Sequence, residues 1–388
     1  MNSPVMEEQG PLLRTFRRLP LSLTHGEGVY VFDVEGRKYL DFYAGHAVAS
    51  TGHCHPRVVR AIQDQAATLI FYSNVAGLRL RDEAAALLVS KAPEGFTQVL
   101  FANSGAEANE NALKMARRHT GRAGVVAMTG GFHGRTAGAV SVTGVEKYRK
   151  SSVPLVPGVT FVPFGDLEAL TAAVGPDTAA VILEPIQSMA GVKTASADYF
   201  KGLRSVCDKA GAQLIYDEVQ TGIGRTGTMF FAGRHGVLPD LITLAKGIAS
   251  GVPLSAVLVR DVIAERVAYG DYGATFGAGP LAMAAMKATL EVIDDEKLLD
   301  NVHRTSEIAR RSLGSVPGVR EVRGLGFLLG LKIDGDAPKV QAQLLGRGAI
   351  VGTSDEPGVL RLLPPLTLKP EHVGALADML APSLAAAR

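Results

Sequence analysis

The chain has little cysteine and no long apolar run. These two shortages argue against a disulfide-rich protein and against a membrane-spanning protein. Only Cys54 and Cys207 occur among 388 residues, too few for a disulfide framework. Glycine, proline or charge interrupts every apolar stretch before it reaches the roughly 18 to 20 residues of a membrane span. The first residues also lack a basic segment that leads into an apolar one. We therefore expect a soluble, cytoplasmic protein with no membrane partner.

An excess of one charge is missing as well. The chain carries 40 basic and 38 acidic residues, and no basic cluster is longer than residues 117–119, which are typical of a solvated helix end. We expect no nucleic-acid partner. The cluster His53, Cys54, His55 has no companion cluster with zinc-site spacing, so we predict no metal site.

Short apolar runs separated by helical patterns dominate the middle of the chain. Hydrophobic residues make up 47% of the sequence, enough for a large core and more than one domain. The runs cover residues 98–101, 124–128, 180–183, 214–216 and 241–244. Strands that alternate with helices in this way predict an α/β fold with a mainly parallel sheet covered on both faces.

The two ends of the chain show different patterns. Residues 28–32 and 38–42 alternate on either side of a turn, which predicts a hairpin. A helical pattern runs from Ala282 to Leu298, and a mixed strand and helix region follows. The expected domains are a large one over residues 56–280 and a smaller α+β one from residues 1–55 and 281–388.

Two of the apolar runs end in complementary groups. Residues 214–216 lead into Asp217, and residues 241–245 lead into Lys246. Because open α/β sheets bind ligands at the carboxyl ends of their strands, this acid and this amine should meet there. Pyridoxal phosphate needs a lysine to form a Schiff base with its aldehyde and an anion to keep its ring nitrogen protonated. The pair therefore predicts a pyridoxal 5'-phosphate site.

A possible phosphate site follows the run at residues 98–101. Ser104 and Glu107 form a capping box that starts a helix, which leaves the amides of Gly105 and Ala106 free for an anion. Alone, the pattern is more typical of an ordinary helix start with water on those amides. Residues 222–227 match G-x-G-x-x-G, but they lie in mid-chain and no helical pattern follows, so we predict no dinucleotide site.

Six segments stand in the same order as in the class III aminotransferases, and the chain most resembles the acetylornithine aminotransferases among them. The segments are residues 103–110, 132–136, 184–187, 217–222, 244–247 and 275–277. The resemblance extends from about Gly28 to Leu366. It implies fold type I of the pyridoxal phosphate enzymes and a homodimer with active sites shared between the subunits.

The resemblance also implies a role for each matching residue. Lys246 would bind the cofactor and then move a proton, while Asp217 would pair with the ring nitrogen. Thr275 would reach the phosphate of the neighbouring subunit. The other implied cofactor residues are Ser104, Gly105 and Ala106 at the phosphate, Phe132 and Val219 on the two ring faces, Gln220 at the ring hydroxyl, and His133 and Glu184.

Two arginines resemble the carboxylate-binding arginines of the family. Arg135 and Arg361 suit a dicarboxylate, because a guanidinium binds a carboxylate through two parallel hydrogen bonds. Met189 stands where amine-terminal relatives have a glutamate that neutralises the second arginine, and His46 stands at a wall of the expected substrate site. Each of these two differences from the family either changes the substrate specificity or leaves it unaffected.

The expected function is amino transfer from an acetylornithine-type ω-amino acid to 2-oxoglutarate. The alternative is a class III transaminase of an α-amino acid or another amine, or a decarboxylating or isomerising relative, with a different acceptor. A non-catalytic cofactor-binding protein is a third hypothesis, disfavoured because both Lys246 and Asp217 are present.

Overall fold

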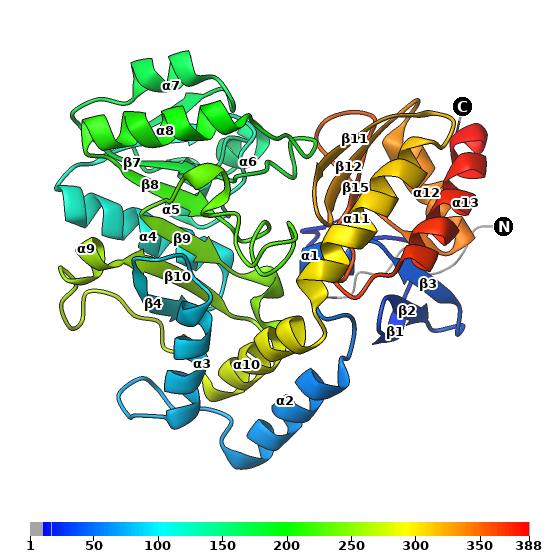
Figure 1. Cartoon of the computed structure of the whole chain (residues 1–388), viewed down its shortest axis with the longest axis horizontal. Helices are drawn as coiled ribbons and strands as arrows, with labels where there is room; N and C mark the ends of the chain where they lie inside the picture. Colours follow the sequence, from blue (N-terminus) through cyan, green and yellow to red (C-terminus); the bar gives the residue numbers. More distant parts are fainter. Residues whose placement is uncertain (1–10, 17, 388) are drawn as a thin grey trace.

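A seven-stranded sheet is the largest feature of the computed structural model, which describes residues 11–16 and 18–387 (Figure 1). Residues 1–10 of the expected segment 1–55 thus lie outside the described residues, as do residues 17 and 388. The strands, in spatial order, are β4 (Phe96–Ala102), β10 (Ser255–Arg260), β9 (Leu241–Leu244), β8 (Gln213–Asp217), β7 (Thr178–Leu183), β5 (Gly124–Met128) and β6 (Val159–Val162). Strands β5 to β9 are parallel, whereas β10 runs antiparallel to both of its neighbours. The predicted α/β fold with a mainly parallel sheet is confirmed.

The five predicted strands of this sheet are all present, and two more were not predicted. The pattern missed β6 and β10. Strand β10 is buried between β4 and β9, and its reversed direction depends on pairing with segments far away in the chain. Because β10 reverses direction, β4 and β9 point the same way, so their carboxyl ends lie at one edge.

Side chains that alternate along the strands pack into two separate layers. Leu214 and Tyr216 of β8 pack with Phe200 of helix α8 (Ala197–Ala210), whereas Ile215 packs on the opposite face with Ala112 of helix α4 (Gly105–Thr120). This is the period of two that a pleated strand imposes. The expectation of a sheet covered on both faces is therefore confirmed.

Two four-stranded sheets lie outside this large sheet. The first contains β1 (Leu23–Glu27), β2 (Tyr30–Asp33), β3 (Lys38–Asp41) and β13 (Ala349–Ile350); the second contains β11 (Val319–Leu325), β12 (Leu328–Ile333), β15 (Val359–Leu362) and β14 (Gly352–Thr353). The predicted hairpin is the β2–β3 pair. Because β13 pairs with β3, segments from both ends of the chain lie side by side in Figure 1. The division into domains at residues 56 and 280 stays a prediction.

The prediction of one long helix from Ala282 to Leu298 is wrong at its carboxyl end. Helix α10 (Pro280–Asp295) stops early, and α11 (Leu298–Gly314) starts after Lys297, whose φ of 52° lies in the left-handed region. Neither glycine nor proline marks this break. The other helical segments are α2 (Pro56–Thr68), α3 (Arg79–Ser90), α5 (Ala137–Ser141), α6 (Glu146–Lys150), α7 (Leu167–Ala173), η2 (Arg234–Gly236), η3 (Lys246–Ala249), α9 (Asp261–Ala264), α12 (Ala337–Arg347) and α13 (Pro370–Ala386). Among the described residues, no helix is both long and apolar enough to cross a membrane.

A left-handed turn follows β3. The residues of α1 (Ala44–Ala47) have φ values of 46°, 58°, 72° and 64°, although only Gly45 adopts that region without steric cost. The Asp41 carboxylate holds the turn, because one oxygen accepts the amides of Tyr43 and Ala44 at 2.8 and 2.9 Å and the other lies 2.8 Å from His53 Nε2. The turn fixes the positions of two side chains, Tyr43 and His46.

Candidate active site

The predicted meeting of Asp217 and Lys246 is present in the structure. Asp217 ends β8 opposite Thr243 of the parallel neighbour β9, and Lys246 follows β9 by two residues. Lys246 Nζ makes no hydrogen bond or ion pair within the described part of the chain. Burial lowers the pKa of this ammonium; the Asp217 and Glu184 charges oppose that shift, while Arg361 adds to it. A buried amine with a lowered pKa is suited to nucleophilic and proton-transfer chemistry.

The Asp217 carboxylate is held on several sides. Its Oδ2 accepts a hydrogen bond from Asn109 Nδ2 at 2.8 Å and lies 2.7 Å from His133 Nδ1, while its Oδ1 accepts the Val219 amide at 3.1 Å. Asn109 is in turn fixed by Thr243 Oγ1, which donates to its Oδ1 at 2.7 Å. Sequence analysis missed Asn109, although an asparagine among the alanines of this helical pattern can indicate a polar group on the buried face of the helix.

Glu184 forms a second buried acid beside this pair. Its Oε1 accepts the amide of Phe132 at 2.8 Å, which fixes the segment that carries Phe132 and His133. Burial raises the pKa of Glu184 to about 7; the Asp217 charge acts in the same direction, and His133 opposes it.

The expected capping box is present at the start of α4. Glu107 N donates to Ser104 Oγ at 3.2 Å, and Ser104 N donates to the Glu107 carboxylate at 2.7 Å. The amides of Gly105 and Ala106 have no partner among the described residues. A Cβ on Gly105 would lie 3.0 Å from the methyl groups of Val219, so the glycine brings this helix start close to the end of β8.

These groups match pyridoxal phosphate on four separate points. The free amides at the positive end of α4 suit the phosphate, Asp217 suits a protonated ring nitrogen, and the Lys246 amine suits the aldehyde. The fourth point is Gln220, whose buried Oε1 has no hydrogen-bond partner in the described structure and follows Val219 directly. The residues present therefore fit this cofactor.

Two of the candidate substrate residues, Arg361 and His46, share Tyr43 as a neighbour. Arg361 of β15 is only 7% exposed; its Nη2 donates to Tyr43 Oη at 2.7 Å and its Nη1 to Ser188 Oγ at 3.2 Å. The centre of the His46 ring lies 4.6 Å from that of Tyr43, with the two ring planes tilted by 56°. Burial lowers the pKa of His46, and the positive charges of Arg361 and Lys246 lower it further. Sequence analysis missed Tyr43 and Ser188.

The remaining predicted substrate and cofactor residues are less enclosed. The guanidinium of Arg135 is exposed and lies 4.6 Å from the centre of the Tyr148 ring. Met189 is half-buried and its carbonyl accepts the Asp355 amide at 2.8 Å. Thr275 lies in an exposed loop, and no hydrogen bond connects it to the start of α4 within the described chain.

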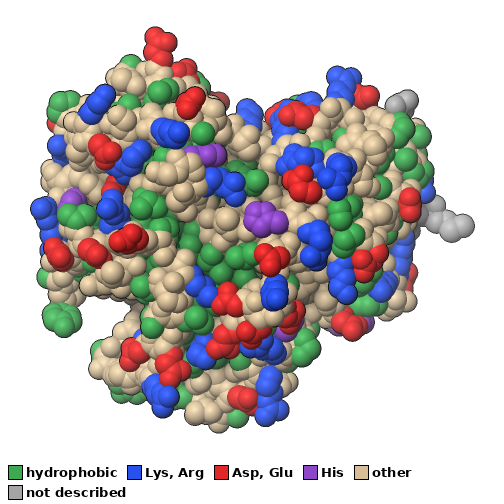
Figure 2. All heavy atoms as spheres, in the orientation of Figure 1, with side chains coloured by type: hydrophobic (Ala, Val, Ile, Leu, Met, Phe, Trp, Pro, Cys, Tyr) green, Lys and Arg blue, Asp and Glu red, His purple; other side chains and the backbone are tan. Residues whose placement is uncertain are grey.

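The two histidines of the rejected metal motif have structural partners. His53 contacts Asp41, and His55 both accepts the Arg57 amide at the start of α2 and lies 2.9 Å from Glu296. No group of three or more potential ligands within the described ranges could hold a metal ion. Over the face shown in Figure 2, basic and acidic side chains intermingle.

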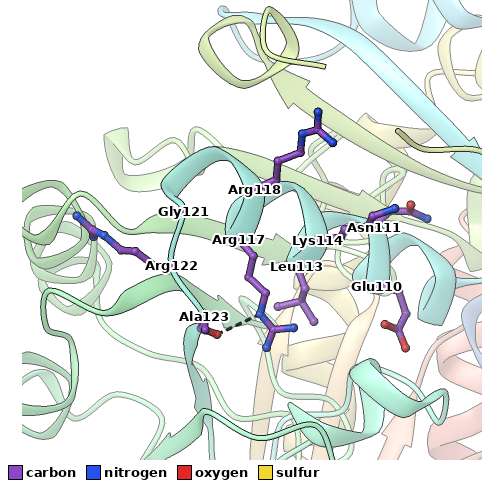
Figure 3. A pocket seen from close by; sticks show the side chains of 9 residues that line it. All are labelled: Glu110, Asn111, Leu113, Lys114, Arg117, Arg118, Gly121, Arg122 and Ala123. Carbon is purple, nitrogen blue, oxygen red and sulfur yellow. Dashed lines mark hydrogen bonds between the residues drawn. The ribbon is translucent and has the colours of Figure 1, made fainter. Parts of the chain in front are cut away.

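A surface hollow of about 690 Å³ lies along α4 and the turn that leads into the amino end of β5 (Figure 3). Neither Asp217 nor Lys246 is among the residues that line it. Its basic side chains already have partners: Arg117 Nε donates to the Ala123 carbonyl at 3.1 Å, and Arg118 pairs with Asp271 at 2.7 Å. We assign this hollow no part in the site.

Comparisons with known proteins agree with this geometry. The family model described as aminotransferase class III matches residues 14–384. The acetylornithine aminotransferase of Methanocaldococcus jannaschii is 42% identical, over 95% of this chain and 94% of its own. Among solved structures, the ornithine aminotransferase of Toxoplasma gondii aligns with a TM-score of 0.91 and 32% identity, over 97% of this chain and 93% of its own. The acetylornithine aminotransferase of Elizabethkingia anophelis aligns with a TM-score of 0.85 and 30% identity, over 96% of each chain.

Proposed function

Since this chain belongs to the class III aminotransferases, enzymes of fold type I that depend on pyridoxal phosphate, we propose that it transfers an amino group from an acetylornithine-type ω-amino acid to 2-oxoglutarate. The donor is supported by relatives with that name at 39 to 42% identity over nearly the whole chain. The observation that carries the proposal is the free, buried amine of Lys246 beside the firmly held carboxylate of Asp217.

In this proposal, the ends of β8 and β9 and the start of α4 hold the cofactor. Asp217 would accept the ring N–H, Gln220 would bond the ring hydroxyl, and the amides of Gly105 and Ala106 would bind the phosphate. Val219 and Phe132 would enclose the ring, with Ser104, His133 and Glu184 fixing the surrounding backbone and carboxylate. When bound, the cofactor supplies a conjugated ring that accepts the electron pair left on the substrate carbon.

Lys246 would hold the cofactor and then act as proton carrier. Because burial lowers the pKa of its ammonium, more of the amine is neutral near pH 7 than for a solvent-exposed lysine. A neutral Nζ would accept a proton from the substrate carbon, and the resulting ammonium would donate that proton to the aldehyde carbon of the cofactor, as amino transfer requires. The neighbouring Asp217 and Glu184 charges stabilise the protonated form of Nζ between these steps.

The two arginines would orient a dicarboxylate. Arg361 would bind the carboxylate beside the reacting carbon, and Arg135 the farther one. His46 and Met189 line the same region. An α-amino-acid transaminase is the second candidate function, favoured by one observation: among the described residues, no carboxylate lies within 4 Å of Arg361.

We further propose a homodimer. Exposed apolar side chains gather beside Thr275, where Phe276 is 64% exposed and its ring centre lies 5.0 Å from that of Phe71, next to Tyr72 and Val75. A second copy would cover this surface, and its Thr275 would reach the phosphate. Sedimentation should give twice the mass of one chain, and Phe276→Asp should shift it towards monomer with loss of activity; a monomeric active protein would contradict the proposal.

We also propose a cytoplasmic location, because Cys54 is exposed and unpaired and such thiols stay reduced there. Fractionation of cells that produce the protein tests this.

The donor is tested by measuring glutamate formed from acetylornithine and 2-oxoglutarate with the cofactor-loaded protein. A panel of α-amino and ω-amino donors against 2-oxoglutarate, pyruvate and glyoxylate serves as the comparison. Faster turnover of acetylornithine than of every α-amino donor supports the first function, and the reverse order supports the second. Absence of turnover with any amine would remove both.

A further inference from the structure

The Arg361 guanidinium is held entirely by neutral oxygens. Nε donates to the Thr353 carbonyl at 2.6 Å, and the two terminal nitrogens donate to Ser188 and Tyr43. A guanidinium has five N–H donors, so two remain, one on each terminal nitrogen. No acid among the described residues neutralises this buried charge.

The two hydroxyl partners retain donors of their own. Tyr43 Oη and Ser188 Oγ each accept a hydrogen bond from Arg361, and neither donates one to another described group. A carboxylate at this place would therefore meet two N–H and two O–H donors. Ser188 is 1% exposed, so its hydroxyl is shielded from water.

The position of Tyr43 is itself built into the fold. Its backbone lies at the start of the left-handed turn held by Asp41, and a Cβ on Gly352 of β14 would lie within 2.1 Å of the Tyr43 ring. Gly352 thus gives the ring the space that it occupies beside Arg361, whose carbon centre lies 5.6 Å from the ring centre.

We propose that Tyr43 and Ser188 are positioning residues that keep Arg361 open as a carboxylate subsite through both halves of the reaction. An internal acid would have to leave before a substrate carboxylate could bind, whereas neutral hydroxyls orient the guanidinium without cancelling its charge. The ligands of this subsite are compounds with a carboxylate on the reacting carbon, namely α-amino acids and 2-oxo acids. The inference rests on the proposed role of Arg361 in substrate binding.

Binding of glutarate to the holoenzyme, measured by calorimetry, tests the subsite without turnover. Tyr43→Phe and Ser188→Ala should each weaken glutarate binding by about tenfold to a hundredfold, the effect of losing one hydrogen bond at a charged group. Tyr269→Phe and Ser315→Ala remove hydroxyls at exposed positions elsewhere and should leave the affinity unchanged. Gly352→Ala, which displaces the Tyr43 ring, should act like Tyr43→Phe and replaces it if that variant does not fold.

Steady-state kinetics separates positioning from general damage. The KM for 2-oxoglutarate should rise by the same factor while kcat and the KM for acetylornithine, which has no carboxylate on its reacting carbon, change less than about twofold. Unchanged glutarate affinity in both variants, or an equal rise in the KM for acetylornithine, overturns the inference. If glutarate affinity depends on Tyr43 and Ser188 as expected, but the wild-type protein does not turn over acetylornithine, then the proposed donor is wrong and the proposed subsite still stands.

Discussion

Replacing Asn109 by alanine should destabilise the protein far more than the same replacement of an exposed asparagine would. The side chain is 1% exposed; its Nδ2 donates to Asp217 Oδ2 and to the His133 carbonyl, both at 2.8 Å, and its Oδ1 accepts from Thr243 at 2.7 Å. Losing bonds to one charged and two neutral partners, and leaving the Thr243 hydroxyl unsatisfied, should cost about 3 kcal/mol. Equilibrium unfolding of the cofactor-free protein in urea measures this loss.

A matched control lies two residues along the same helix. Asn111 donates to the Glu107 carbonyl at 2.8 Å in a half-buried position, so Asn111→Ala should cost less than about 1 kcal/mol. A double-mutant cycle of Asn109→Ala with Thr243→Val should give a coupling energy of about 1 kcal/mol. Equal losses for the two asparagine variants, or a coupling energy of zero, would refute the reasoning.

Three other perturbations test the site. Lys246→Ala should still bind the cofactor but lose the absorbance of the lysine-linked form, with kcat lower by about a hundredfold to ten-thousandfold; a retained band would identify another lysine as the anchor. Met189→Glu should improve kcat/KM for acetylornithine relative to α-amino donors by about fivefold, or about 1 kcal/mol, because it gives Arg361 an acid; an unchanged ratio would end the argument. Between pH 4.5 and about 7 the folded chain keeps a proton on Glu184 that the unfolded chain has released, so this residue makes stability fall as pH rises, by up to about 3 kcal/mol. Glu184→Gln should flatten the fall in melting temperature from pH 5 to 7, with exposed Glu307→Gln as control; an unaltered slope would contradict this.

Local patterns in the sequence were sufficient for the parts of the fold that depend on neighbouring residues. The runs that become β8 and β9, and the box of Ser104 and Glu107, follow from apolar periodicity and helix capping. Their shared sheet edge then follows from the rule for parallel strands.

Contacts between distant segments had no such signal. Tyr43 and Arg361 are 318 positions apart, and nothing in the sequence around either residue indicates that they meet. The reversed strand β10 and the break at Lys297 likewise depend on tertiary pairing and on a left-handed residue that is not glycine. The roles assigned to the site residues and the domain boundaries stay predictions.

The left-handed turn after β3 affects both the thermal stability of the protein and its discrimination between substrates. Ala44, His46 and Ala47 each occupy a region that disfavours L-amino acids by roughly 1 to 2 kcal/mol. Glycine at Ala44 or Ala47 would relieve this strain, but the unfolded chain would gain about 0.4 to 1 kcal/mol of conformational freedom, and a buried methyl group worth about 0.8 kcal/mol would be lost. The free energy of unfolding should therefore change little, while the more flexible turn would let Tyr43 and His46 move away from the reacting centre. Measurements of thermal stability alone would thus not reveal a substitution at this turn that impairs discrimination between substrates.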